Sequence, residues 1–445
     1  MKKITLILIN VLIFIPFISS ANSQDLEEFS QRRERFRTAM AKNSVAIFKS
    51  AKKVNRNGDV NYEFRQGSNF YYLTGLDEPE SALIISKERR FLRTKNGFFA
   101  GNEFLYVRPR NPAMEQWTGK RLGIEGAKKE MGIELVFDIT DFKKHLPGYL
   151  RGVDTLYIKI PGVGLDQPLN EELTLIKNLK ERLFSFEILD PGTILSKIRI
   201  IKSDSELKLI QKAIDITGEA LIEAMKSAKP GMYEYELEAI IEFIFRWNGS
   251  ERLGFPSIIG SGPNSVILHY TKNDRKIESG DLVVLDVGAE YGYYTADVTR
   301  TIPISGKFTE PQKEIYSIVL KAQRMAIEAV KPGITLNDLN QIARDYLNSK
   351  GYGKYFIHGL SHFVGLDVHD AGNRSVTLEP GMVFTIEPGI YINPDESDVD
   401  PEYRGIGVRI EDDILLTEKG AVILSKKIPR TIEAVEKIMA KKGRF

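Results

Sequence analysis

The chain has 445 residues, of which 42% are hydrophobic and 27% are charged, a composition typical of globular proteins. Because a single hydrophobic core stops growing at about 250–300 residues, we expect two domains. The net charge is +2 and no block of basic residues stands out, so neither nucleic acid nor an anionic membrane surface is an expected partner. The chain has no cysteine, which excludes disulfides, lipid attachment at a cysteine and thiol catalysis.

The first residues have the pattern of an export signal. Lys2 and Lys3 precede an apolar run from Ile4 to Ile18, and small residues suited to cleavage follow at 21–23. An uncleaved membrane anchor is the alternative, but the run is short for a bilayer span. We therefore predict that residues 1–23 are a signal peptide and that the mature protein is periplasmic or secreted, without stable membrane insertion.

Residues 24–192 predict an N-terminal α/β domain. The pattern favours helices over 26–40, 112–122, 126–131 and 171–182, and strands over 44–49, 78–85, 104–107 and 155–160. The aromatic cluster Phe70, Tyr71 and Tyr72 is interpreted as core or interface packing, with a role in substrate binding as the alternative. The turn signal Asp190-Pro-Gly192 closes this domain, and 193–203 is expected to be a linker.

The second domain is expected over residues 204–445. Ser203 and Glu206 have the spacing of a capping box, and the helix that they open ends at Lys229-Pro230, where proline cannot continue it. The domain then repeats its own pattern about a hundred residues later. The matching segments are 229–249 and 331–351 for the helices, and 280–288 and 381–389 for the strands. We therefore expect two pseudo-twofold copies of helix, helix and strands, with a ligand site between them.

Each copy carries acidic residues at corresponding points. Asp286 and Glu387 end hydrophobic strands. With a turn at Glu290–Tyr293, Asp297 is expected to lie directly opposite Asp286 across a hairpin, about 5 Å away. In the second copy, alternation along a strand puts Arg409 and Glu411 on the same face.

The negative charges of these acids require compensation. Carboxylates that face one another on apolar strands repel, and desolvation forces some of them to be neutral unless cations bind. Three of the five histidines lie within His358–Asp370, which adds imidazole ligands to the region. Exposed strand-end acids and satisfied histidines are the alternative interpretation. An oxygen-rich set with imidazole fits Mn²⁺, Co²⁺ or Zn²⁺, and two ions can activate a water molecule.

These motifs, taken together, resemble those of the pita-bread metallopeptidases, and most of all their aminopeptidase P branch. The motifs are His269-Tyr-Thr, Asp286-Val-Gly, Asp297-Val-Thr-Arg-Thr, His358-Gly-Leu-Ser-His362, Thr385-Ile-Glu387-Pro-Gly and Gly407-Val-Arg-Ile-Glu411-Asp. The segments 69–75, with Glu78-Pro79, and 117–123 resemble the N-terminal domain of that branch. The resemblance covers essentially the whole mature chain and implies an α/β (α+β) protein with an N-terminal α/β domain and a C-terminal pita-bread domain.

The resemblance also implies a site. It makes Asp286, Asp297, His362, Glu387 and Glu411 the ligands of two divalent ions, with Mn²⁺ expected first and Co²⁺ or Zn²⁺ as alternatives. Asp297 and Glu411 bridge the ions in this hypothesis. His269, His358 and His369 line the substrate site, and Arg409 holds a metal-bound acid there. Asp367 and Asp370 are expected to be structural, and His145 receives no role.

The implied reaction is release of the first residue from peptides whose second residue is proline. In this hypothesis a bridging hydroxide attacks the carbonyl before proline, Glu387 carries the proton, and His269 and His369 stabilise the intermediate. Proline preference comes from the resemblance alone. A prolidase, which cleaves only dipeptides, and a metal-free binding protein remain alternatives. The resemblance further implies a homo-oligomer, either a dimer or a tetramer.

Overall fold

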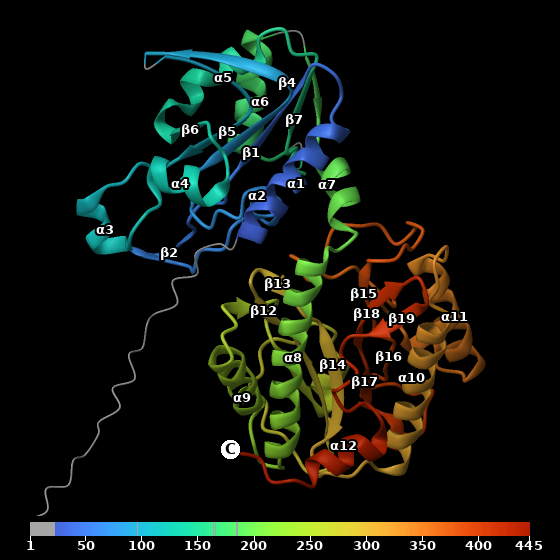
Figure 1. Cartoon of the computed structure of the whole chain (residues 1–445). Coiled ribbons are helices and arrows are strands. Elements are labelled where there is room, and N and C mark those ends of the chain that lie inside the picture. The colour runs from blue at the N-terminus through green and yellow to red at the C-terminus, as the bar shows by residue number, and fades with distance from the viewer. Residues whose placement is uncertain (1–22, 96, 163, 165, 184–185) are drawn as a thin grey trace, which may run out of the picture. The chain divides into compact units, whose positions relative to one another are not determined.

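The computed structural model describes residues 23–95, 97–162, 164, 166–183 and 186–445 (Figure 1). The chain divides between Ile194 and Leu195 into two compact units. The predicted signal peptide lies almost wholly outside the described residues. Among the helices of the described part, none combines the length and apolar character that a membrane span requires.

The N-terminal unit is built on one six-stranded sheet with the order β6-β5-β4-β1-β7-β8. The strands are β1 (Ser44–Lys49), β4 (Ala82–Thr94), β5 (Gly97–Val107), β6 (Val136–Asp138), β7 (Thr155–Ile158) and β8 (Glu187–Leu189), and a small hairpin joins β2 (Asn55–Asn57) to β3 (Val60–Asn61). The helices are α1 (Ser23–Ala39), α2 (Ser68–Thr74), α3 (Pro112–Thr118), α4 (Gly123–Met131), α5 (Phe142–Leu150) and α6 (Glu171–Arg182). Antiparallel pairing joins β1, β4 and β5, and parallel pairing joins the outer strands.

Several elements of this unit differ from the sequence prediction. The strand expected at 78–85 is observed at 82–94, and its partner begins at Gly97 instead of Phe104. The outer half of this hairpin carries exposed charged residues at 88 and 89, so the apolar pattern ends before the backbone pairing does. The segment expected as a linker is mostly helix α7 (Gly192–Arg199), in which Leu195 and Arg199 are buried. The pattern also missed α2, α5, β6 and β8.

The C-terminal unit contains two halves of similar construction. The first has α8 (Asp204–Ser227), α9 (Glu234–Trp247) and the sheet of β10 (Ile258–Ser261), β11 (Leu282–Val287) and β14 (Val298–Pro303). The second has α10 (Glu310–Ala329), α11 (Leu336–Ser349) and the sheet of β15 (Val383–Ile386), β18 (Asp412–Thr417) and β19 (Gly420–Ile423). The pair β16 (Gly389–Tyr391) and β17 (Gly407–Arg409), the short strands β9 (Arg252–Leu253), β12 (Ala289–Tyr291) and β13 (Tyr294–Thr295), and α12 (Ile432–Met439) complete it.

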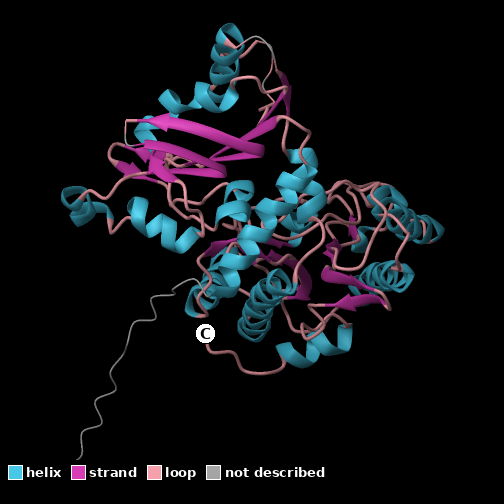
Figure 2. Cartoon of the chain, turned by 45° about the horizontal axis from the view of Figure 1, so that its top comes forward, coloured by secondary structure: helices cyan, strands magenta, loops and turns pink. Residues whose placement is uncertain are grey.

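The helices of this unit lie outside its strands (Figures 1 and 2). One hydrophobic core cluster joins the buried faces of helices and strands from both halves. Local sequence sets the helix limits, since Ser203 and Glu206 form the predicted capping box of α8 and Thr309 caps α10 in the same way. Helix α8 ends before the Lys-Pro-Gly turn at 229–231, as predicted from proline, and α10 ends before the equivalent turn at 331–333. The predicted repeat therefore corresponds to two helix pairs that cover two sheets.

Candidate active site

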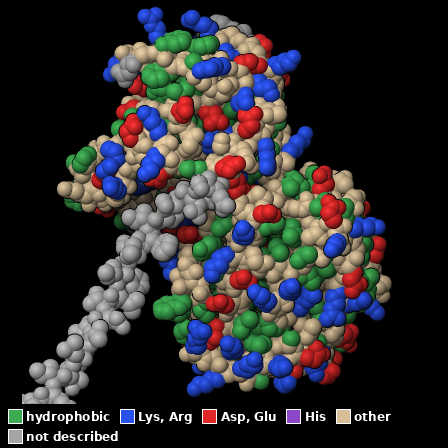
Figure 3. Space-filling model, in the orientation of Figure 1, with side chains coloured by type: hydrophobic (Ala, Val, Ile, Leu, Met, Phe, Trp, Pro, Cys, Tyr) green, Lys and Arg blue, Asp and Glu red, His purple; other side chains and the backbone are tan. Residues whose placement is uncertain are grey.

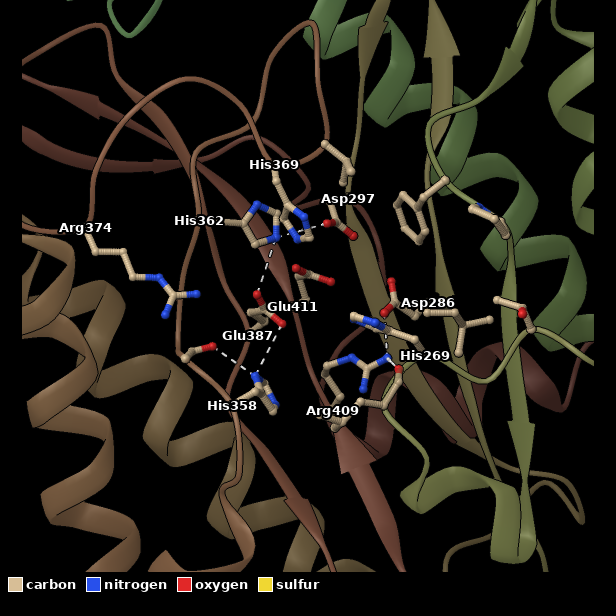
Figure 4. Close-up of a pocket in the computed structure, with 17 residues that line it drawn as sticks. His269, Asp286, Asp297, His358, His362, His369, Arg374, Glu387, Arg409 and Glu411 are labelled. Atoms are coloured by element: carbon tan, nitrogen blue, oxygen red, sulfur yellow. Dashed lines mark hydrogen bonds and ion pairs between the residues drawn. The ribbon is translucent and has the colours of Figure 1, made fainter. Parts of the chain in front are cut away.

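All nine sequence-predicted site residues line one cavity of about 580 Å³ in the C-terminal unit (Figure 4). The first half supplies one wall and the second half supplies the other. Asp286 lies in β11, Asp297 directly before β14, Glu387 directly after β15 and Glu411 between β17 and β18. His269, His358, His362, His369 and Arg409 complete the predicted set, and Arg374 and Phe255 also line the cavity.

The register of the first hairpin differs from the prediction. Tyr291 pairs with Tyr294 around a two-residue turn, in which Gly292 and Tyr293 have φ values of 56° and 73°. The turn therefore lies one position further along the chain than expected, and Asp286 pairs with Thr299 rather than with Asp297. Asp297 is therefore a diagonal neighbour of Asp286. Thr299 lies directly opposite Asp286 and contacts Glu411 and Arg409 of the second half.

Three of the predicted ligands form a tight group. Ligand atoms of Asp297, His362 and Glu411 all lie within 4.8 Å of one another. His362 Nε2 is 3.3 Å from Asp297 Oδ2 and 3.4 Å from Glu387 Oε1, so Glu387 adjoins the group (Figure 4). Asp286 is not a member of the group of Asp297, His362 and Glu411, and its Oδ2 accepts a hydrogen bond of 2.5 Å from Arg409 Nη2.

Carboxylate oxygens in the cavity lack partners. Among the described residues, Asp286 Oδ1, Asp297 Oδ1 and Glu411 Oε1 are buried without a hydrogen bond. Such atoms cost free energy unless a hydrogen-bond donor or a cation satisfies them. An oxygen-rich donor set with one imidazole, aimed at a common space, suits divalent cations such as Mn²⁺, Co²⁺ and Zn²⁺. The residues present therefore fit the predicted metal ions.

The electrostatics of the acids support the same conclusion. Burial, reinforced by the nearby carboxylates, raises the pKa values of Asp297 and Glu411 well above the ordinary range. Burial also raises the pKa of Glu387 to about 7. Bound cations would favour the ionised forms and reverse these shifts.

Arg409 connects the two halves of the site. Its Nε lies 3.2 Å from Thr299 Oγ1, and its Nη1 donates to the hydroxyl of Tyr391 at 2.9 Å, in addition to the bond to Asp286. Thr299 Oγ1 donates to Glu411 Oε2 at 2.6 Å. Thr299 thus orients one predicted ligand, and Arg409 orients another, which agrees with the predicted role of Arg409 beside an acid.

The histidines differ in their surroundings. His358 Nδ1 lies 2.9 Å from the carbonyl of Gly359 and its Nε2 lies 2.8 Å from the hydroxyl of Tyr391. Burial lowers the pKa of His358 to about 4, so the ring is neutral; Nδ1–H donates to the carbonyl and Nε2 accepts from the phenol. The rings of His369 and His362 meet edge to face at 4.3 Å, and burial lowers the pKa of His369. His269 lines the cavity.

Sequence reasoning missed the groups that support these residues. Thr299 and Tyr391 were not singled out, although Thr299 lies two residues after Asp297, the spacing of one strand face. Gln323 was also missed: from α10 its Nε2 lies 3.2 Å from the carbonyls of Ile386 and Ile410, which directly precede predicted ligands. A polar residue on the buried face of a helix was the signal that could have revealed it.

A fully buried ion pair lies beneath the site. Arg300 and Asp412 have no exposed side-chain surface, and Arg300 Nη2 donates to Asp412 Oδ1 at 2.7 Å. Arg300 Nη1 also donates to the carbonyls of Thr299 and Glu411, so it fastens β14 to the segment that carries Glu411. Arg430 Nη1 donates to the second oxygen of Asp412 at 2.7 Å.

The two acids near His369 have partners of their own. Arg199 binds both Asp367, at 2.8 Å, and Asp370, and Lys202 Nζ lies 2.7 Å from Asp370. Neither acid lines the cavity. These contacts agree with the expectation that Asp367 and Asp370 are structural, since they tie the loop that carries His369 to the start of the C-terminal unit.

Comparison with known proteins assigns both units. The family described as aminopeptidase P, N-terminal domain, matches residues 29–157, and metallopeptidase family M24 matches residues 208–418. An Xaa-Pro aminopeptidase of Haemophilus influenzae is 38% identical over 436 residues, which cover 93% of this chain and 97% of the relative. This chain belongs to the aminopeptidase P family of M24 metallopeptidases.

Other relatives agree with this assignment. The structure of the aminopeptidase PepP of Pseudomonas aeruginosa superimposes with a TM-score of 0.84 at 34% identity, covering 93% of this chain and 98% of that one. An Xaa-Pro dipeptidase of Pyrococcus furiosus is 40% identical but covers only 68% of this chain. The predicted two-domain α/β architecture with a pita-bread domain is confirmed, and the chain is a metallo-aminopeptidase of the aminopeptidase P family.

The raised pKa values predict an unusual pH dependence for the metal-free enzyme. A carboxyl whose pKa is raised on folding stabilises the protein below its unfolded pKa, and that contribution is lost as the pH rises through the folded value. For Glu387 that value is about 7. In chelator, the thermal unfolding midpoint is therefore expected to fall between pH 6 and pH 8. Added Mn²⁺ should raise the midpoint more at pH 8, where fewer protons compete for the carboxylates.

Replacement of Glu387 by Gln supplies the control, because it should flatten this slope. If the midpoint of the metal-free enzyme rose from pH 6 to pH 8, with the same slope in the Gln variant, the raised pKa of Glu387 would be contradicted.

The buried ion pair of Arg300 and Asp412 leads to a second prediction. Arg300→Met leaves Asp412 as a buried carboxylate with one fewer cation, and we expect it to destabilise the unit by about 3–5 kcal/mol. Urea unfolding followed by circular dichroism measures the change. Arg324→Met, on the exposed side of α10, is the matched control and should change stability by less than about 0.5 kcal/mol. Equal stabilities of the two variants would show that the pair does not hold the strands together.

Proposed function

We propose that this metal-dependent exopeptidase releases the N-terminal residue from peptides with proline in the second position, as the names of its relatives indicate for those proteins. The observation that carries the proposal is the group of Asp297, His362 and Glu411 beside Glu387, with buried carboxylate oxygens that no hydrogen-bond donor among the described residues satisfies. A family relationship over 93% of the chain supports the substrate class.

The metal ions would be held by the five predicted ligands, Asp286, Asp297, His362, Glu387 and Glu411. Two divalent cations bound there would supply Lewis acidity toward the scissile carbonyl and would lower the pKa of a water molecule. We propose Mn²⁺ as the ion that is used, with Co²⁺ or Zn²⁺ as alternatives. The oxygen-rich donor set supports this choice.

The chain's own groups orient the reactants and move protons. A carboxylate oxygen of Glu387 can take the proton of the attacking water and pass it to the prolyl nitrogen, which leaves as a secondary amine. The neutral imidazole of His369 presents an N–H that can donate to the developing oxyanion, and His269 lines the same cavity. Because the bond before proline has no amide hydrogen, the site needs no acceptor for one.

Hydrolysis of a peptide series tests this function. With Mn²⁺, chelated and reconstituted enzyme should release alanine from alanyl-prolyl-alanine, and Asp297→Ala should lower kcat/KM by at least about 100-fold, since loss of even an outer partner of a metal ligand costs about 10–100-fold. Asp395→Ala, at an exposed acid, is the control and should retain activity. Activity of Asp297→Ala equal to that of the control would refute the site.

The same series separates the two peptidase alternatives. An aminopeptidase hydrolyses the tripeptide at least as well as the dipeptide alanyl-proline, whereas a prolidase cleaves the dipeptide alone. Hydrolysis confined to the dipeptide would replace the proposed function by the prolidase function. Absence of divalent ions from the reconstituted protein would favour a non-catalytic binding role.

We also propose that the protein is exported and that it forms a dimer or tetramer. The basic start and apolar run at 2–18 support export. N-terminal sequencing of the mature protein should begin near residue 24, and light scattering should give two or four chains. A mature protein that starts at Met1 would contradict export, and a monomer would contradict assembly.

A further inference from the structure

The N-terminal unit contains a second cavity, of about 590 Å³, between the outer part of β4 and helix α5. Its apolar lining includes Leu92 and Phe137, and its remaining lining is rich in basic side chains. None of these residues belongs to the site described above. A volume of this size is within the usual range for small-ligand sites, about 300–1,000 Å³.

The charge of this cavity is strongly one-sided. Arg93, Lys95, Lys144 and Arg151 line it and are exposed, and among the described lining residues Asp141 is the only acid. Asp141 Oδ1 lies 3.9 Å from Lys144 Nζ.

The other three cations are free to act on a ligand. In the described part of the chain, Arg93, Lys95 and Arg151 have no acidic side chain within ion-pair distance. Figure 3 shows Lys and Arg side chains together with hydrophobic ones on the part of this unit where β4 and α5 lie in Figure 1. A concave surface that carries several positive charges raises the local concentration of anions.

A buried histidine adds a directed donor to this cavity. His145 lines the cavity with only 7% of its surface exposed, and its Nδ1 lies 3.1 Å from the hydroxyl of Tyr106. The hydroxyl of Tyr106 lies 2.8 Å from that of Tyr149, which is fully buried. These three groups form a short hydrogen-bonded chain inside the unit.

The direction of this chain fixes the tautomer of His145. If Nδ1 carried the proton, it would donate to Tyr106 and Tyr106 would donate inward to Tyr149, and the buried hydroxyl proton of Tyr149 would have no acceptor among the described residues. In the opposite direction, Tyr149 donates to Tyr106 and Tyr106 donates to Nδ1, so every buried proton is used. Burial lowers the pKa of His145 and keeps the ring neutral. Nε2 therefore carries the proton, and in the described part of the chain it has no hydrogen-bond acceptor.

We propose that this cavity is a binding site for a small polyanion that carries phosphate or carboxylate groups. Arg93, Lys95 and Arg151 neutralise its charge, and His145 Nε2–H donates to one of its oxygens. The preference for anionic oxygen follows from the donor set, since arginine, lysine and the Nε2–H group only donate. Leu92 and Phe137 supply an apolar surface for the body of the ligand.

Isothermal titration with pyrophosphate and with citrate at 150 mM NaCl tests this proposal. At least one anion should bind saturably with Kd at or below about 1 mM. The double variant Arg93→Ser/Arg151→Ser should weaken that binding by at least about tenfold, because it removes two charge-assisted contacts. Pyrophosphate binding alone would identify a phosphate ligand, and citrate binding alone a carboxylate ligand.

Lys129→Ser/Lys159→Ser removes two exposed cations of the same unit that do not line the cavity, and it should bind as the unmodified protein does. His145→Phe, with a thermal unfolding midpoint measured alongside, tests the donor separately and should also weaken binding. Absence of saturable binding of both anions, or equal weakening in the two double variants, would overturn the proposal.

Discussion

The structure depends on one electrostatic constraint: four carboxyl groups are brought into a cavity lined by apolar strands, where they cannot all be ionised without cations. Asp286, Asp297, Glu387 and Glu411 all line this cavity, and three of them carry buried oxygens without a hydrogen-bond partner in the described part of the chain. The raised pKa values of the acids express the cost of holding them together without compensation. Metal binding and folding of this unit are therefore coupled, because the same charges enter both.

The remaining groups around the cavity keep this costly arrangement in place. Arg409 and Thr299 reach from one half to the other and orient the acids, while Arg300 and Asp412 fasten the strands beneath. These side chains are buried, and Arg409 and Arg300 each make several hydrogen bonds, which limits the movement of the carboxylates. The pseudo-twofold halves thus supply opposite walls, and the hydrogen bonds between them set the separation of the ligands.

Much of this could be predicted from sequence. The internal repeat, the proline-terminated helices and the acids at strand ends follow from short-range patterns, and the combined motifs indicate the family. The exact pairing did not follow, because a turn at Gly292–Tyr293 and a turn one residue earlier fit the same alternation. The supporting residues Tyr391 and Gln323 were also not predicted, since their roles depend on contacts between segments that are far apart in the sequence.

Anomalous diffraction from crystals of the Mn²⁺-reconstituted enzyme tests the central claim most directly. The account predicts two anomalous peaks per chain, both between Asp286, Asp297, His362, Glu387 and Glu411, at positions that satisfy the buried oxygens. A single peak elsewhere in the chain, or none with the carboxylates still clustered, would show that the acids do not depend on metal ions and would contradict the account.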